Sequence, residues 1–252
     1  MLKHSFVKRI LLIAFLLLVV LFFLKLIPFW FLFIPALLYL VAIAVGSYFI
    51  QLNYFLVSFN KSTKQEKKIA LTFDDGPITE KTLHLLDLLK AEDVKATFFL
   101  IGKNIRGNEN VVRRIVEDGH LVGSHSYSHT NAFPLFSKEK IMNDIAKGNE
   151  AIERVTGRNV LWFRPPFGVT NPNIAKAVTE LKLQSIGWSI RSYDTVINDE
   201  QKLLSRLEKT KAGDIILLHD WGAKTLAVLP SFVSKYKALG FEFVGVDELM
   251  RK

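Results

Sequence analysis

Leu71-Thr-Phe-Asp-Asp-Gly-Pro77 sets two adjacent carboxylates at the end of an apolar, strand-like run, directly before a Gly-Pro break. A buried pair of like charges is costly for folding unless one member holds a proton or a cation lies beside them. Further along the chain, His125-Ser-Tyr-Ser-His129 supplies two imidazoles suited to binding such a cation. Together the two stretches indicate a hydrolytic metal site.

The composition narrows the chemistry of this site. The 252 residues are 50% hydrophobic and include no cysteine, which excludes disulfides and leaves His and carboxylate side chains as ligands for any transition metal. The formal net charge is +9, but residues 1–68 hold eight Lys and Arg against one acidic residue, so the rest of the chain carries only about +2. Nucleic-acid-binding proteins usually spread basic residues over a binding face. We therefore expect no nucleic-acid partner.

The N-terminal region is too apolar for a surface in contact with water. Lys25 is the only charged residue between Ile10 and Asn60. One helix over residues 10–50 would be about 60 Å long, twice the roughly 30 Å of a bilayer core. We therefore predict two transmembrane helices, at about 10–27 and 29–50, with the turn at Pro28. They form a membrane anchor over residues 1–60, and residues 61–252 form the soluble domain.

This anchor predicts a multi-pass protein of the bacterial cell membrane, with the lipid bilayer as a partner. A cleaved signal peptide is the alternative, but the apolar region is too long for one and lacks a clear small-residue cleavage site. Lys and Arg flank both outer ends of the hairpin, which favours a cytoplasmic position for both. The second basic cluster begins about ten residues beyond the membrane, so its influence is weaker and the side of the soluble domain is left open.

The soluble domain alternates strand-like with helical segments. Strands rich in β-branched and aromatic residues are expected at Ile69–Phe73, Ala96–Ile101, His120–Ser124, Val160–Arg164, Leu183–Trp188, Asp214–Leu218 and Phe241–Val246. Amphipathic helices are expected at Glu80–Lys90, Asn110–Asp118, Lys138–Val155, Asn171–Glu180, Glu200–Lys209 and Thr225–Leu239. Repeated strand–helix units predict an α/β fold with a parallel sheet.

Polar residues follow most of these strands at their carboxyl ends. They are Asp74 and Asp75, His125 and His129, Arg164, Arg191 and Asp194, and His219. In a barrel these ends converge on one rim, whereas an open sheet would spread them too widely. We therefore predict a distorted seven-stranded (β/α) barrel.

His125 and His129 are four residues apart, so one helical turn or a tight loop can aim both imidazoles at one ion. Asp75 would complete a set of two histidines and one carboxylate. Such a set leaves positions open for water and substrate, and it suits Zn²⁺ as well as other divalent metals.

Four motifs in this order and spacing resemble those of the polysaccharide deacetylase family, the NodB-homology domains of carbohydrate esterase family 4. They are Thr72-Phe-Asp-Asp-Gly-Pro77, His125-Ser-Tyr-Ser-His129, Arg164-Pro-Pro-Phe-Gly168 and Leu217-Leu-His219, and the resemblance spans residues 68–250. It implies a distorted (β/α) barrel and a hydrolase of carbon–nitrogen bonds other than peptide bonds. The implied reaction is the metal-dependent removal of N-acetyl groups from amino sugars, which releases acetate.

The resemblance also implies a role for each matching residue. Asp75, His125 and His129 resemble the metal ligands, with zinc the expected ion and Co²⁺, Ni²⁺ or Mn²⁺ as alternatives. Asp74 resembles the general base, Arg164 the arginine that pairs with it, and His219 the general acid. The backbone N–H of Phe167, where the family commonly has Tyr, resembles the oxyanion donor. Trp188, Leu217 and Leu218 are expected to form an apolar slot for the acetyl methyl group.

The fourth motif departs from the family pattern. Where the family usually has Asp-x-x-Asp-Trp, this chain has Arg191-Ser-Tyr-Asp194-Thr195. A second arginine near Asp74 would make that carboxylate a weaker base unless another acid neutralised it. Our hypothesis is that Asp194 pairs with Arg191 and so preserves the base.

Three functions are compatible with these residues. The first is deacetylation of a cell-surface glycan, such as peptidoglycan or a chitooligosaccharide. The second is a deacylase or deformylase of a lipid-linked sugar, which a hairpin anchor with a cytoplasmic domain would favour. The third is a non-catalytic glycan-binding barrel, which the altered fourth motif permits.

Overall fold

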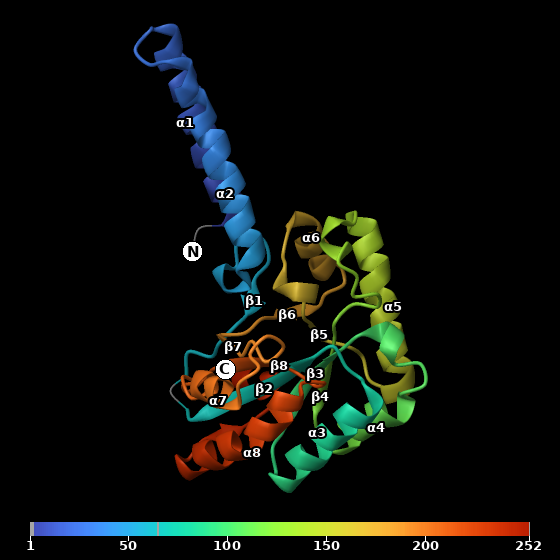
Figure 1. Cartoon of the computed structure of the whole chain (residues 1–252). Helices are drawn as coiled ribbons and strands as arrows, with labels where there is room; N and C mark the ends of the chain where they lie inside the picture. The colour runs from blue at the N-terminus through green and yellow to red at the C-terminus, as the bar shows by residue number, and fades with distance from the viewer. Residues whose placement is uncertain (1–2, 65, 252) are drawn as a thin grey trace.

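The computed structural model describes residues 3–64 and 66–251 and shows a helical hairpin joined to a rounded α/β domain (Figure 1). The hairpin consists of α1 (His4–Phe23), the short 3₁₀ helix η1 (Phe29–Phe33) and α2 (Ile34–Tyr48). The chain turns between Phe23 and Pro28, which directly precedes η1. The predicted bounds shift, since α1 begins at His4 rather than near residue 10 and α2 ends at Tyr48.

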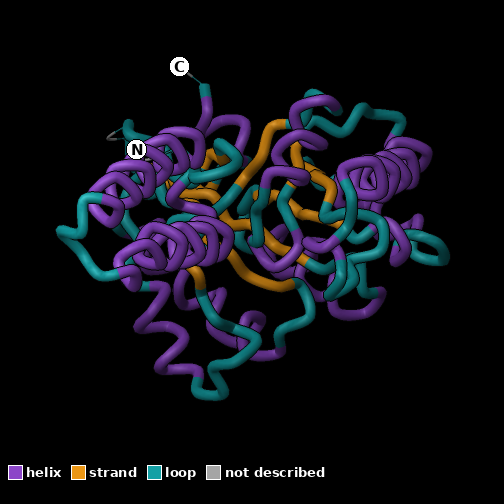
Figure 2. Tube along the Cα trace, turned by 90° about the horizontal axis from the view of Figure 1, so that it is seen from above, coloured by secondary structure: helices purple, strands orange, loops and turns teal. Residues whose placement is uncertain are grey.

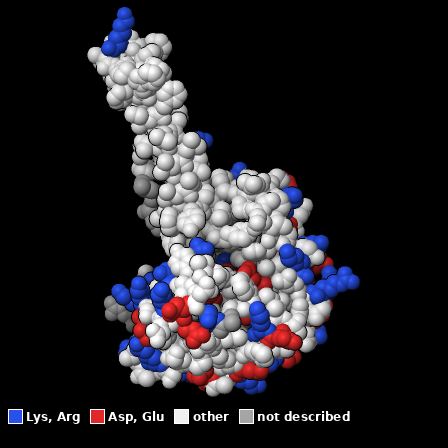
Figure 3. Space-filling model, in the orientation of Figure 1, with Lys and Arg blue, Asp and Glu red and all other residues white. Residues whose placement is uncertain are grey.

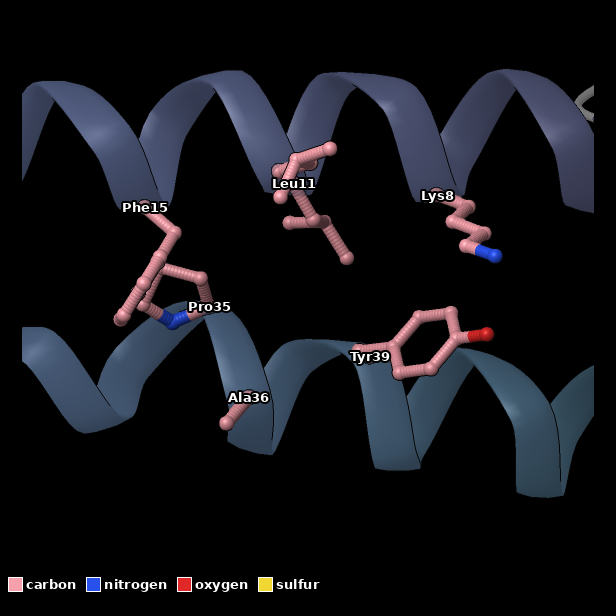
Figure 4. A pocket seen from close by; sticks show the side chains of 7 residues that line it. Lys8, Leu11, Phe15, Pro35, Ala36 and Tyr39 are labelled. Carbon is pink, nitrogen blue, oxygen red and sulfur yellow. The ribbon is translucent and has the colours of Figure 1, made fainter.

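The surface of the hairpin is almost free of charge, whereas Lys, Arg, Asp and Glu gather on the rounded domain (Figure 3). Its two apolar segments, His4–Phe23 and Phe29–Tyr48, are each 20 residues long, which is sufficient in length and composition to cross a membrane. Between them lies a hollow lined mainly by apolar side chains, with the Lys8 ammonium at one end (Figure 4). Such a hollow suits hydrocarbon rather than a sugar, so a carbohydrate site is expected in the rounded domain.

Nine parallel strands build the described part of the domain, with helices packed around them (Figure 2). The strands are β1 (Ser58–Phe59), β2 (Lys68–Asp74), β3 (Ala96–Leu100), β4 (Leu121–Ser124), β5 (Trp162–Phe163), β6 (Gln184–Ile186), β7 (Ile190–Arg191), β8 (Ile215–His219) and β9 (Glu242–Phe243). The helices are α3 (Thr79–Ala91), α4 (Glu109–Glu117), α5 (Lys138–Thr156), α6 (Pro172–Glu180), α7 (Glu200–Leu207), α8 (Ala223–Ala238) and α9 (Val246–Met250), with the 3₁₀ turns η2 (Ile50–Leu52), η3 (Gly102–Asn104), η4 (Phe133–Leu135) and η5 (Pro166–Gly168).

The sheet is a curled half-barrel rather than the predicted seven-stranded barrel. Its order is β1-β6-β5-β4-β3-β2-β8-β7, and β9 pairs with β2. Each of the seven predicted strands is present, but β1 and β7 are additional, so the predicted number was wrong. Both have only two residues, but β5 and β9 are equally short. The difference is that β1 lies in the stretch assigned to the membrane anchor and β7 directly follows the predicted strand Leu183–Trp188. In the described part of the chain, no strand ladder joins the edge strands β1 and β7.

Residues 187–189 cross the seam between these two edges. Gly187 N donates to Phe59 O at 3.0 Å on one side, and Ser189 N donates to Ile215 O at 3.0 Å on the other. Residues 187–189 therefore connect β6 to β7 across the seam and hold Trp188 there. The predicted strand Leu183–Trp188 thus ends early, because the chain leaves one edge of the sheet to reach the other.

Alternate side chains along the strands face two different cores. Leu71 and Phe73 of β2, with Leu218 of β8, pack in the large cluster between the sheet and its helices. Leu217 instead faces the interior of the half-barrel, where it lies in one cluster with Trp188. The prediction that Leu218 lines the acetyl slot was therefore wrong, because neighbouring side chains along a strand point to opposite faces of the sheet.

Ile50, which follows the hairpin, belongs to the interior cluster and is 1% exposed. We expect Ile50→Ala to lower the free energy of unfolding of the domain by about 2–5 kcal/mol, because it leaves a cavity in a packed core. Denaturation of the full chain in detergent, followed by tryptophan fluorescence, measures this. Leu52→Ala is the control, since Leu52 is 45% exposed. Equal stability of the two variants would contradict the packing described.

Candidate active site

Three predicted metal ligands converge where β2 and β4 end. Asp75 Oδ1 lies 3.7 Å from His125 Nε2 and 3.5 Å from His129 Nε2. All three ligand atoms lie within 4.8 Å of one another. Around one tetrahedral zinc ion, neighbouring ligand atoms are about 3.4 Å apart. The arrangement of Asp75, His125 and His129 therefore fits a divalent ion with little movement.

The histidines are oriented by their other contacts. His125 Nδ1 donates to Arg164 O at 2.8 Å, which turns Nε2 towards the other two predicted ligands. His129 N donates to Ser126 Oγ at 3.0 Å. Burial, followed by the charge of His125, lowers the pKa of His129 to about 4. The neutral form of His129 is the form that binds a metal ion.

The His125–His129 stretch forms a tight loop, one of the two conformations that the spacing allowed. The backbone of Ser126 and of His129 is left-handed, with φ of 68° and 44°. Asp144, on α5, accepts hydrogen bonds from the N–H groups of Tyr127 and Ser128 at 2.9 and 3.2 Å. This carboxylate holds the middle of the loop and thereby fixes both histidines.

Asp74 points to a different partner from Asp75. Arg164 donates from NH1 to Asp74 Oδ1 at 2.7 Å and to Thr72 Oγ1 at 2.8 Å. Arg164 is fully buried, and its remaining donors bond Ile186 O and Gly187 O. Asp74 is therefore paired through Oδ1 with a buried cation. Asp74 Oδ2 lies 3.7 Å from His125 Nε2, so Asp74 and the predicted metal ligands share one rim.

His219 lies at the end of β8 and is held by Asp194. Its Nδ1 donates to Asp194 Oδ1 at 2.8 Å, and its backbone N–H donates to Oδ2 at 2.8 Å. Burial alone would lower the pKa of His219, but the bond to Asp194 and the charge of that carboxylate raise it above its ordinary value. Burial would likewise raise the pKa of Asp194, yet the bond to His219 and its charge hold that pKa below its ordinary value.

The predicted pairing of Asp194 with Arg191 was wrong. Asp194 bonds His219, Thr225 and Ser192, and no ion pair joins it to Arg191 among the described residues. The Arg191 guanidinium lies 5.8 Å from the ring centroid of Trp188 and 5.1 Å from that of Tyr193. No Arg191–Asp74 ion pair occurs within the described ranges either. Arg191 therefore does not contact Asp74 as an ion-pair partner, and Asp194 instead holds His219.

Of the predicted substrate residues, Phe167 contacts a predicted metal ligand, and Trp188 and Leu217 lie together in the interior of the half-barrel. Phe167 has a left-handed backbone with φ of 60°, and its ring centroid is 4.7 Å from that of His129. Trp188 lines the interior with Leu217 and lies so close to Gly168 that a Cβ there would be 2.2 Å from its ring. The roles of Phe167, Trp188 and Leu217 in binding substrate remain predictions. Trp188 lies against Gly168, directly after Phe167, and in one cluster with Leu217.

Sequence reasoning missed three contributors to the rim. Asp144 holds the histidine loop, and Thr72 receives a bond from Arg164. Trp221 Nε1 donates to Asp75 Oδ2 at 3.3 Å. Thr72 begins the first motif, and Trp221 lies two residues after His219, so both had a signal in the sequence. Asp144 lies inside a helix, where nothing in the local pattern marks it.

The curled βα fold, with Asp75, His125 and His129 gathered on one rim, suits a hydrolase that uses a divalent metal, and the comparisons identify the family. A family model described as "Polysaccharide deacetylase" matches residues 61–186. A Bacillus cereus peptidoglycan-N-acetylglucosamine deacetylase is 37% identical over 192 residues, covering 74% of this chain and 89% of that protein. The chain belongs to the polysaccharide deacetylase family.

Another relative is much longer than this chain. The peptidoglycan-N-acetylglucosamine deacetylase PgdA of Listeria monocytogenes is 38% identical over 187 residues, which are 74% of this chain and 39% of PgdA. The match therefore leaves most of PgdA without a counterpart here.

Solved structures of BA3943 show that the fold does not by itself decide activity. The wild-type Bacillus anthracis protein, described as a CE4 family pseudoenzyme, has a TM-score of 0.72 at 29% identity, covering 77% of this chain and 69% of that chain. A mutant described as having restored enzymatic activity also has a TM-score of 0.72, at 31% identity over 77% of this chain and 71% of that chain. Whether a protein with this fold is active therefore depends on its side chains at the rim.

We expect Asp144→Ala to weaken zinc binding by about 10-fold to 100-fold, because the histidine loop loses the carboxylate that fixes it. Isothermal titration of the metal-stripped full chain with Zn²⁺ measures the affinity. Glu150→Ala is the matched control on the same helix, since Glu150 pairs only with the exposed Arg154. Unchanged affinity in Asp144→Ala would show that the loop keeps its shape without this carboxylate.

Proposed function

We propose that the protein is a metal-dependent deacetylase that hydrolyses the N-acetyl group of an amino sugar in a glycan and releases acetate. The observation that carries the proposal is the separation of the two adjacent carboxylates. Asp75 faces two imidazoles, whereas Asp74 is paired with the buried Arg164. One carboxylate is thus available to a metal ion and the other to a proton, as amide hydrolysis requires.

Zinc is the proposed metal, and Co²⁺, Ni²⁺ and Mn²⁺ suit the same ligands. Asp75, His125 and His129 would hold it. When bound, the ion supplies a positive charge that makes water acidic enough to act as a nucleophile at neutral pH.

The remaining steps belong to the side chains of the rim. Asp74 accepts the proton of the attacking water. The N–H of Phe167 donates to the carbonyl oxygen as negative charge develops there, a kind of contact worth about 3 kcal/mol in other hydrolases. Protonated His219, oriented by Asp194, gives its Nε2 proton to the departing nitrogen. Trp188 and Leu217 receive the acetyl methyl group.

Peptidoglycan is the first substrate to test, because the Bacillus cereus and Listeria monocytogenes relatives are both named as peptidoglycan-N-acetylglucosamine deacetylases. Chitooligosaccharides and other cell-surface polysaccharides present the same N-acetyl group. A deacylase or deformylase of a lipid-linked sugar is the second candidate. The short connection between hairpin and domain favours it, since α2 ends at Tyr48 and Ile50 is already buried.

A non-catalytic glycan-binding barrel is the third candidate, and the likeness to BA3943 supports it. Two ion pairs argue against this candidate. The proposed base Asp74 is paired with Arg164 at 2.7 Å, and the proposed acid His219 is paired with Asp194 at 2.8 Å. A binding module would need neither pair.

The hairpin is proposed to anchor the protein in the bacterial cell membrane as a multi-pass segment, with the bilayer as its partner. Support comes from two apolar helices of spanning length and from the exposed apolar side chains along them. The side of the membrane on which the domain lies is left open.

We expect the purified full chain in detergent to release acetate from N-acetylglucosamine hexamer or peptidoglycan. Acetate release should stop when EDTA removes the metal and should resume when Zn²⁺ is added. Asp74→Asn should lower kcat by about 10²-fold to 10⁴-fold, because the amide cannot accept the proton. Coupled acetate detection measures both effects. Asp87→Asn, which alters an exposed carboxylate bound to Arg114, is the control. No acetate from any of these glycans, with or without metal, would refute the proposal.

The pH profile tests the acid separately. His219 must be protonated, so activity should fall as pH rises through its raised pKa. Asp194→Asn removes the charge that raises this pKa, and the alkaline limb of kcat against pH should therefore move to lower pH. If the alkaline limb of the Asp194→Asn profile stays in place or moves to higher pH, the assignment of His219 as the acid is contradicted.

A further inference from the structure

The hairpin joins the half-barrel without a flexible linker. We call residues 46–60 the hairpin base. Helix α2 ends at Tyr48, and Ile50 is already 1% exposed inside the barrel. Gly46 lets the chain fold back on the hairpin, because a Cβ there would lie 2.1 Å from the Tyr54 ring. His4 N, at the start of α1, donates to Tyr54 O at 3.1 Å. Both helices are thereby tied to the base.

The hairpin base also covers the seam of the half-barrel. Its strand β1 pairs with β6, and Phe59 O accepts the N–H of Gly187 at 3.0 Å. A Cβ on Gly187 would lie 1.9 Å from Asn60 Oδ1 and 3.4 Å from Ile50 Cγ2. The base therefore packs directly against the residues that cross the seam.

Two further contacts reach the segments that carry the proposed substrate residues. Gln51 Nε2 donates to Trp188 O at 3.1 Å. Thr170, three residues after Phe167, donates from N to Ser47 O at 3.0 Å and from Oγ1 to Gly46 O at 3.3 Å. The last turn of α2 is thus bonded to the loop that follows Phe167.

From these segments a short chain of contacts leads to the proposed base. The Trp188 ring lies against Gly168, and the Arg164 guanidinium lies 5.7 Å from the centroid of that ring. Arg164 in turn bonds Gly187 O and Asp74. The predicted metal ligands Asp75, His125 and His129 make no hydrogen bond or ion pair with the hairpin base among the described residues; they meet these segments only through the Phe167 ring, 4.7 Å from that of His129, and through Arg164 O, which bonds His125.

We propose that the hairpin base is a positioning element of the active site, which fixes Trp188 and the Phe167–Thr170 loop against the membrane hairpin. The activity readout of this inference rests on the proposed function. The oxyanion donor and the acetyl slot then keep their places only while α2 is docked, whereas metal binding does not depend on the docking. The hairpin would serve catalysis as well as anchoring.

The test inserts Gly-Ser-Gly after Phe49, where it uncouples α2 from the barrel, and compares this variant with the same insertion after Lys25 at the far tip. Both are made in the full chain in detergent. The base insertion should lower kcat for N-acetylglucosamine hexamer by about tenfold and leave zinc affinity unchanged. Hydrogen exchange should become faster in residues 166–170 and 187–189. The tip insertion should change none of these quantities.

A single substitution avoids the risk that an insertion unfolds the chain. Gln51→Leu removes one hydrogen bond to Trp188 O and should lower kcat by about threefold to fivefold, with Gln201→Leu on α7 as the matched exposed control. Unchanged kcat in both base variants would overturn the inference. So would a loss of zinc affinity that parallels the loss of kcat, since the base would then only stabilise the barrel. If the unmodified chain releases no acetate, the proposed function fails, and the hydrogen-exchange comparison alone decides the inference.

Discussion

The buried ion pair between Arg164 and Asp74 is the interaction on which the rest of the site depends. Arg164 is fully buried, so its charge must be compensated within the protein. It is compensated by Asp74 at 2.7 Å and by the oxygens of Thr72, Ile186 and Gly187. One guanidinium thus connects β2, β5 and the seam. Removing it would leave an unpaired buried carboxylate and free the chain segment that closes the half-barrel.

The same pair separates the roles of two adjacent residues. Strand β2 ends at Asp74, whose side chain faces Arg164. Asp75 has a left-handed backbone with φ of 78°, a conformation that Asp adopts more readily than most residues. The turn directs its carboxylate towards the imidazoles instead. The two neighbouring carboxylates therefore face different partners, Arg164 for Asp74 and the two imidazoles for Asp75.

The sequence predicted the local parts of this arrangement and missed those that depend on distant contacts. Seven strands and the cluster of Asp75, His125 and His129 were predictable, because runs of β-branched and aromatic residues and motif spacing can be read along the sequence. Strands β1 and β7 were not, since β1 lies in the stretch assigned to the anchor and β7 directly follows another predicted strand. The partner of Asp194 was also misassigned. Arg191 is three residues away and His219 is 25 residues away, yet the fold brings the distant one into contact. Nor did any pattern show that Gln51 and Thr170 join the hairpin to the rim.

Anomalous diffraction at the zinc edge from crystals of the full chain grown with Zn²⁺ tests the division between the two carboxylates most directly. The account predicts one ion about 2.0–2.2 Å from an Asp75 oxygen and from Nε2 of His125 and His129, with Asp74 still paired with Arg164. An ion bound through Asp74, with Arg164 released from it, would contradict the account.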